Sequence, residues 1–87
     1  MSTADLIRQR LAALEPETFT LEDESAQHKG HAGAASGGGH FRLTLVSPRF
    51  RNLSTLARHR LVYEAMGELM QREIHALSIT ALTPEEL

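Results

Sequence analysis

The chain contains no cysteine among its 87 residues. It therefore cannot form a disulfide, and no thiolate of its own can bind a metal or attack a substrate. It also lacks any uninterrupted apolar stretch close to the roughly 20 residues that cross a bilayer. Charged residues interrupt the apolar positions at the N-terminus, which excludes the core of a signal peptide. These absences predict a soluble, cytoplasmic protein with no membrane segment.

The motifs of several common enzyme classes are absent as well. No serine lies in a Gly-x-Ser-x-Gly sequence, which positions the nucleophile of many hydrolases. The glycine run at 37–39 is not followed by Gly-Lys-Ser/Thr and leads into a predicted strand, so it is not a phosphate-binding loop. No pair of carboxylates is set against an apolar pocket. The sequence thus predicts a protein that works by binding and is not an enzyme.

The hydrophobic pattern predicts a single α+β domain over residues 1–87, in the order α-β-β-α-β. A first helix, capped by Ser2 or Thr3, ends near Leu14 because Pro16 follows. Alternation predicts strands at 18–23, 41–45 and 75–82, and Ser54 caps one long helix whose apolar face is Val62, Ala65, Met66 and Leu69. Residues 83–86 have the sequence of a helix cap and first turn. A three-stranded sheet with the helices packed on one face buries all of these apolar stripes.

A glycine-rich segment separates the first two predicted strands. Five of the six glycines fall between Ser25 and Gly39, with alanine and serine between them. Because no side chain there could anchor a core, we expect a long, flexible loop over about 25–39. Loops of this length in compact domains are usually either functional or disordered.

Positive charge is concentrated in the middle of the chain. Residues 42–60 contain five arginines and no acid: Arg42, Arg49, Arg51, Arg58 and Arg60. Such asymmetry can mark a face that binds a polyanion or a partner, but it is equally typical of a solvated basic edge. In the predicted helix, Arg58 and Arg60 can contact phosphates or form salt bridges.

Four of the five histidines lie where the loop and the strands could converge: His28, His31, His40 and His75. Neutral imidazole is a common ligand of zinc and iron. No spacing of high specificity for a metal is present, however, so spacing alone favours solvated histidines. A site with two protein histidines would also need ligands from elsewhere. The fifth, His59, is spaced with Val62 and Met66 on one helix face, which indicates a core or boundary residue.

Several segments together resemble the BolA family, in order and with matching spacing, from the first strand to Leu82. They are Asp23-Glu24-Ser25, His40-Phe41 after the glycine-rich loop, Val46-Ser47 before Phe50, Arg58-His59-Arg60-Leu61-Val62-Tyr63, and Ile74-His75-Ala76-Leu77-Ser78-Ile79. The resemblance implies a fold similar to the type II KH domain. It also implies pairing with a monothiol glutaredoxin and a shared [2Fe-2S] cluster.

In that family the glutaredoxin and its glutathione supply thiolates, and the BolA protein supplies two ligands. The histidine of the His-Ala-Leu segment corresponds to His75, and the loop ligand corresponds to His31, with His28 as a near alternative. Replacing thiolate by imidazole raises the reduction potential of a cluster, so the resemblance implies a labile, transferable one. We expect no cluster in the isolated chain, which would be a monomer or a weak homodimer.

The resemblance also implies an alternative function, because family members have been described as DNA-binding transcription regulators. The region concerned coincides with the basic stretch, so the candidate phosphate contacts are Arg49, Arg51, Arg58 and Arg60. The family often carries Phe-x-Gly-Lys-Ser where this chain has Phe50-Arg51-Asn52-Leu53-Ser54. Asn52 can replace glycine since asparagine tolerates a left-handed backbone. The basic stretch, residues 42–60, contains neither a Gly-x-x-Gly clamp nor an aromatic stacking platform.

Overall fold

A computed structural model of the chain describes residues 2–24, 39–72 and 74–87, with the backbone alone for His75. The elements, where η is a 3-10 helix, are α1 (Thr3–Leu11), η1 (Ala12–Leu14), β1 (Thr18–Asp23), β2 (Gly39–Val46), η3 (Pro48–Phe50), α3 (Thr55–Met66), α4 (Leu69–Arg72), β3 (Ile74–Leu82) and η4 (Pro84–Glu86). The first and last residues of each strand lie within two residues of the predicted bounds. No helix in the described ranges is long and apolar enough to span a membrane.

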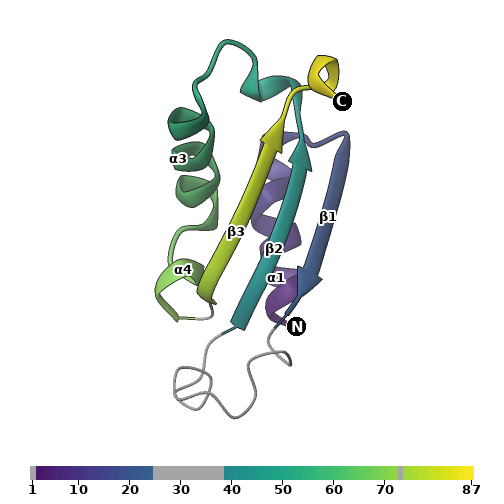
Figure 1. Ribbon diagram of the computed structural model, residues 1–87. Helices are drawn as coiled ribbons and strands as arrows, with labels where there is room; N and C mark the ends of the chain where they lie inside the picture. Colours follow the sequence, from purple (N-terminus) through teal and green to yellow (C-terminus); the bar gives the residue numbers. More distant parts are fainter. Residues whose placement is uncertain (1, 25–38, 73) are drawn as a thin grey trace.

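The sheet is mixed, with the strand order β1-β2-β3. β1 and β2 are antiparallel, and β2 and β3 are parallel. In Figure 1, α1 lies behind the sheet, while α3 and α4 lie along its β3 side. The predicted α+β class, with a three-stranded sheet and helices on one face, is confirmed.

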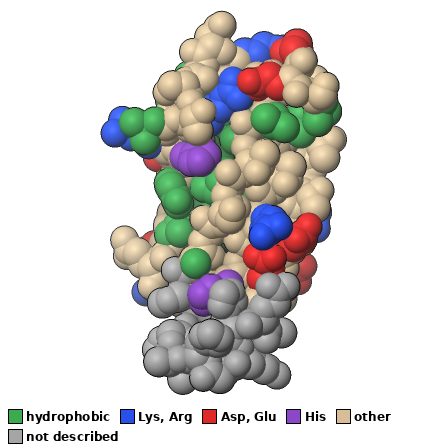
Figure 2. All heavy atoms as spheres, in the orientation of Figure 1, with side chains coloured by type: hydrophobic (Ala, Val, Ile, Leu, Met, Phe, Trp, Pro, Cys, Tyr) green, Lys and Arg blue, Asp and Glu red, His purple; other side chains and the backbone are tan. Residues whose placement is uncertain are grey.

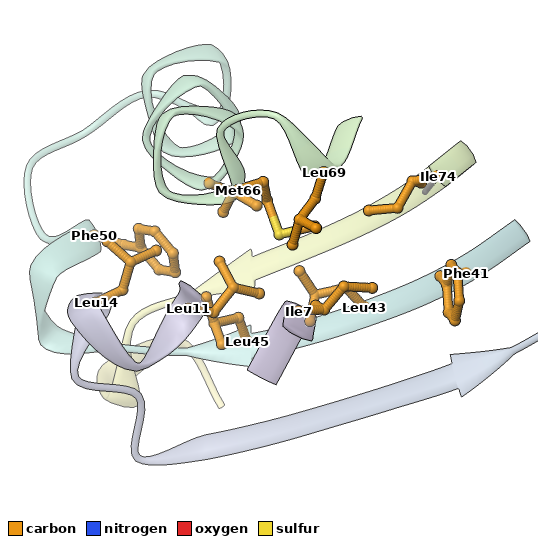
Figure 3. Close-up of a cluster of buried hydrophobic side chains, with 11 residues drawn as sticks. Ile7, Leu11, Leu14, Phe41, Leu43, Leu45, Phe50, Met66, Leu69 and Ile74 are labelled. Atoms are coloured by element: carbon orange, nitrogen blue, oxygen red, sulfur yellow. The ribbon is translucent and has the colours of Figure 1, made fainter. Parts of the chain in front are cut away.

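The core lies between the helices and the inner face of the sheet. Ile7 and Leu11 of α1 and Met66 of α3 converge on Leu43 and Leu45 of β2, and all five side chains are fully buried (Figure 3). The central strand therefore carries the core, since both helices pack on it. Alternation along β2 places Arg42 on the opposite, exposed face.

The first helix begins and ends as predicted. The Ser2 hydroxyl accepts from the Asp5 N–H (3.1 Å), and the Asp5 carboxylate accepts from the Ser2 N–H (3.3 Å). These two bonds hold the pKa of Asp5 below its usual range. The helix tightens into η1 and ends after Leu14, where Glu15 takes a left-handed conformation (φ 50°) just before Pro16.

The prediction of one long helix that starts after Ser54 and includes Leu69 is wrong in one respect. The helix breaks at Gly67. That glycine has φ 57° and ψ −129°, a conformation that ends α3 after Met66. The chain then turns and forms the short helix α4. Leu69 is still buried, as its spacing predicted, but it reaches the core from α4.

The turn between β2 and α3 is held by buried polar bonds. The Ser47 hydroxyl is fully buried, donates to the Leu14 carbonyl (2.5 Å) and accepts from the Arg49 N–H (3.1 Å). These bonds attach the turn to the end of the first helix. Asn52 has φ 64°, which confirms the left-handed conformation expected there. Ser54 then caps α3 by accepting from the Ala57 N–H (3.1 Å).

Candidate functional site

The two parallel strands bring two of the candidate histidines to one end of the sheet. His40 is the second residue of β2 and His75 is the second residue of β3. Because parallel strands start at the same end, their backbones meet there. We call this the histidine end; it is the lower end in Figure 1. The opposite end, which carries η3, the start of α3 and η4, we call the arginine end.

A register shift sets His75 apart from the rest of β3. Gly39 pairs with Ile74, but His40 pairs with Ala76, so one step along β2 spans two residues of β3. His75 is the extra residue of this β-bulge and has no partner on β2. Bulges of this kind bend a strand locally and are over-represented beside functional sites.

Burial along β3 shows why the bulge is needed. Ala76 and Ser78 are exposed, so strict alternation would also place Ile74 on the open face of the sheet. Ile74 is instead 5% exposed and belongs to the core cluster. The bulge therefore lets the Ile74 side chain point into the core. The burial of Ile74 fixes the backbone immediately before His75.

The other two candidate ligands, His28 and His31, lie outside the described residues. The residues that flank this segment, Glu24 and Gly39, are at the histidine end, where the Glu24 N–H donates to the His40 carbonyl (2.7 Å). Within the described ranges, no group of three or more His, Asp or Glu side chains is arranged to hold a metal ion.

At the arginine end and along the sheet, the basic stretch is neutralised by acids from outside it. Arg42 pairs with Glu24 (3.4 Å), Arg49 with Glu15, Arg51 with Glu85 (2.5 Å), and Arg58 with Glu86 (2.6 Å). Figure 2 shows blue side chains adjoining red ones on this face, near its upper end and again lower down. The asymmetry of the sequence therefore does not become a free basic patch on these residues.

The Arg58 side chain is bound within the fold. Its side chain is 13% exposed, and its guanidinium donates to the carbonyls of Leu53 and Ala81 (3.0 Å each) as well as to Glu86. It thereby joins the start of α3 to the end of β3. The Thr83 N–H and Arg58 together lower the pKa of Glu86 to about 2. Of the two interpretations of Arg58, phosphate contact or salt bridge, the structure shows the salt bridge.

Arg60 and His59 occupy different surroundings on the same helix. Arg60 is exposed and has no ion-pair partner among the residues that the structure describes. Two exposed hydrophobic side chains, Leu56 and Tyr63, lie on its face of the helix. His59 is partly buried beside the fully buried Val62, so it is a boundary residue, as its spacing predicted.

The sequence did not reveal two features of the arginine end, the acidic partners of its arginines and a buried serine. The carboxylates of Glu85 and Glu86 are partners of the arginines, although the sequence of 83–86 predicted only a cap and turn. Ser47 belongs to the Val46-Ser47 segment of the family resemblance, but the sequence does not predict its complete burial. The one clue was its place directly after an apolar strand and before a proline.

Comparisons with known proteins agree with this arrangement. A family profile described as BolA-like protein matches residues 11–86. BolA-like protein 1 of Mus musculus is 47% identical over 74 residues, which are 85% of this chain and 52% of that protein. A DNA-binding transcriptional regulator BolA of Haemophilus influenzae is 33% identical over 87 residues, covering 99% of this chain and 82% of that protein.

The solved structures are similar throughout the chain. The BolA domain of SufE1 from Arabidopsis thaliana has a TM-score of 0.86 at 40% identity, covering 100% of this chain and 98% of that one. The solution structure of BolA1 from Mus musculus has a TM-score of 0.79 at 45% identity, covering 97% of this chain and 67% of that one. The chain spans about half the length of the BolA-like protein 1 relatives, and 24% of SufE-like protein 1 from Arabidopsis thaliana.

Proposed function

Because the chain belongs to the BolA-like protein family, we propose that it binds a monothiol glutaredoxin and shares a [2Fe-2S] cluster with it. The observation that carries the proposal is the position of His75, the bulged residue at the histidine end of the sheet. The role would be iron–sulfur trafficking or iron-linked regulation. It is a binding role, and no chemical turnover by this chain is proposed.

The available donors support a shared site. The chain has five histidines and no cysteine, so it can offer imidazole but no thiolate to iron. In the proposal, the thiolates therefore come from the glutaredoxin and its glutathione. His75 would be the ligand on the sheet. A bulged strand held by a buried neighbour offers a fixed backbone for such a ligand, since Ile74 is anchored in the core. When bound, the cluster would supply redox and transfer chemistry that the chain lacks.

The second ligand in the proposal is His31, with His28 as the alternative. Both belong to a segment whose flanking residues, Glu24 and Gly39, are joined to the histidine end. In the proposal, one side chain of that segment joins His75 as a ligand at the histidine end. Separate His31→Ala and His28→Ala substitutions would distinguish the two, because only the true ligand should alter the cluster.

Co-expression with a monothiol glutaredoxin tests the proposal. The complex, purified without oxygen, should be coloured and should show visible absorption and circular dichroism unlike those of the glutaredoxin alone. A colourless complex would indicate an adaptor whose histidines do not bind the cluster. Failure of the two proteins to associate would refute the proposal.

A second function is favoured by the names of two bacterial relatives. Proteins of Haemophilus influenzae and Vibrio cholerae, 33% and 37% identical to this chain, are each called DNA-binding transcriptional regulator BolA. The candidate phosphate contacts are Arg49, Arg51, Arg58 and Arg60, of which the first three are engaged by carboxylates. DNA affinity that falls steeply with salt would support this function, while an affinity that barely changes with salt would exclude these phosphate contacts.

The cellular compartment also belongs to the proposal. We propose a cytoplasmic protein, as the sequence predicted. Two plant relatives carry the words "chloroplastic/mitochondrial" and "chloroplastic" in their names, so location differs among similar proteins. Fractionation of the source cells, with detection by antibody, would test the assignment.

A further inference from the structure

The C-terminal turn places two consecutive carboxylates on two arginines of the basic stretch. Glu85 accepts two bonds from the Arg51 guanidinium, from Nε to Oε1 (2.7 Å) and from Nη2 to Oε2 (2.5 Å). Glu86 accepts from Arg58 (2.6 Å). A carboxylate bound by two parallel N–H groups occupies a guanidinium in the same way as a phosphate does. The Glu85 carboxylate therefore fills the position that a phosphate oxygen pair would take on Arg51.

The two carboxylates have different tasks. Glu86 anchors the turn, because it also accepts from the Thr83 N–H (2.7 Å) and contacts an arginine that is 13% exposed. Glu85 makes no such internal bond to the rest of the turn among the described residues. It covers Arg51, whose side chain is 52% exposed. Glu86 thus keeps the turn in place, and Glu85 covers a solvent-accessible guanidinium.

We propose that Glu85 is an internal competitor for an anion site at Arg51, and that nucleic-acid phosphates bind there only when Glu85 is displaced. The inference rests on the second function proposed above, DNA binding, and concerns how that function is limited. Glu85 and Glu17 both raise the pKa of Arg51. A guanidinium is not deprotonated in proteins, so Arg51 keeps its charge whether or not the turn covers it. Displacement exposes a full positive charge without unfolding α3, since Arg58 and Glu86 are not required to move.

Fluorescence anisotropy with a labelled DNA duplex, over a series of salt concentrations, tests the inference on the full chain. Glu85→Gln removes the competitor and keeps the anchor. Its matched control is Glu64→Gln, which makes the same change in net charge at an exposed position of α3. We expect Glu85→Gln to bind DNA at least about threefold more tightly than the control at low salt, with a slope of log affinity against log salt steeper by about one. Adding Arg51→Gln to Glu85→Gln should cancel both gains.

The outcomes distinguish a failure of the competitor proposal from a failure of DNA binding itself. If Glu85→Gln and Glu64→Gln bind equally, with the same salt dependence, the competitor is refuted while DNA binding stands. If neither variant nor the wild type binds, both are refuted. If the gain survives Arg51→Gln, the site lies elsewhere and the inference is wrong. Thermal unfolding of each variant shows that binding is compared between folded proteins.

Discussion

The two ends of the sheet are held by different kinds of interaction. The arginine end is closed by ion pairs, by a buried serine and by two capped turns, so its polar groups are largely engaged within the chain. The histidine end is formed by a β-bulge and by the anchored flanks of the glycine-rich segment. The difference between the two ends shows that a cluster of charge in the sequence can serve folding and need not form a free binding surface.

The largest expected difference between the two ends is in packing. Phe50, in the turn at the arginine end, is 0% exposed, and Ile74 is its counterpart at the histidine end. Truncating a buried phenylalanine costs about 3–5 kcal/mol, and truncating a buried isoleucine about 2–5 kcal/mol. We expect Phe50→Ala to lower the free energy of unfolding in urea by more than Ile74→Ala does. A loss for Ile74→Ala that equals or exceeds the loss for Phe50→Ala would contradict this order.

A smaller effect should separate structural from surface arginines. Arg58→Met removes two bonds to backbone carbonyls and one ion pair, so it should lower the free energy of unfolding by about 1–3 kcal/mol. Arg60→Met is the matched control on the same helix and should change it by less than about 0.5 kcal/mol, because Arg60 is exposed. Equal effects of the two substitutions would contradict the structural role of Arg58.

The stability of the turn at the arginine end should depend on whether the residue at position 52 tolerates a left-handed backbone. Asn52 has φ 64°, a conformation that disfavours a Cβ-branched or alanine side chain by about 1–2 kcal/mol. Asn52→Ala should therefore destabilise the protein by about 1 kcal/mol, while Asn52→Gly should be close to neutral. Thermal unfolding followed by circular dichroism measures both. A destabilising glycine together with a neutral alanine would show that the turn has another conformation.

The smallest effect concerns pH. The pKa of Glu86 is about 2 in the folded protein, against an ordinary value of 4.5. A carboxyl with a depressed folded pKa stabilises the protein above its unfolded pKa, and this contribution is lost as the pH falls from about 4.5 towards 2. The difference in unfolding midpoint between wild type and Glu86→Gln should be greatest near neutral pH, should shrink as the pH falls below about 4.5, and should be lost only below about pH 2. A difference that stays constant with pH would mean that Glu86 is not held by Thr83 and Arg58.

Much of the fold could be predicted from the sequence, because apolar periodicity and capping residues act locally. The Ser2 and Ser54 caps, the three strands and the left-handed Asn52 follow from short segments. The break at Gly67 was not predicted, since a glycine inside a helical pattern is often tolerated and Leu69 fits the apolar face of an unbroken helix as well.

The site was harder to predict than the fold. The convergence of His40 and His75 follows from the parallel pairing of β2 and β3, which periodicity does not reveal. The partners of the arginines lie more than 20 residues away in most cases, as for Arg51 and Glu85, so a charge count along the chain could not find them. The roles of His28, His31 and His75 as ligands remain predictions from the family resemblance.

The measurement that tests the central claim most directly is the visible spectrum of the glutaredoxin complex with His75→Ala. The matched control is His59→Ala, which removes a boundary histidine from α3. We predict that His75→Ala still associates with the glutaredoxin but loses the mixed-ligand spectrum, whereas His59→Ala retains it. An unchanged spectrum with His75→Ala would contradict the assignment of the histidine end as the cluster site.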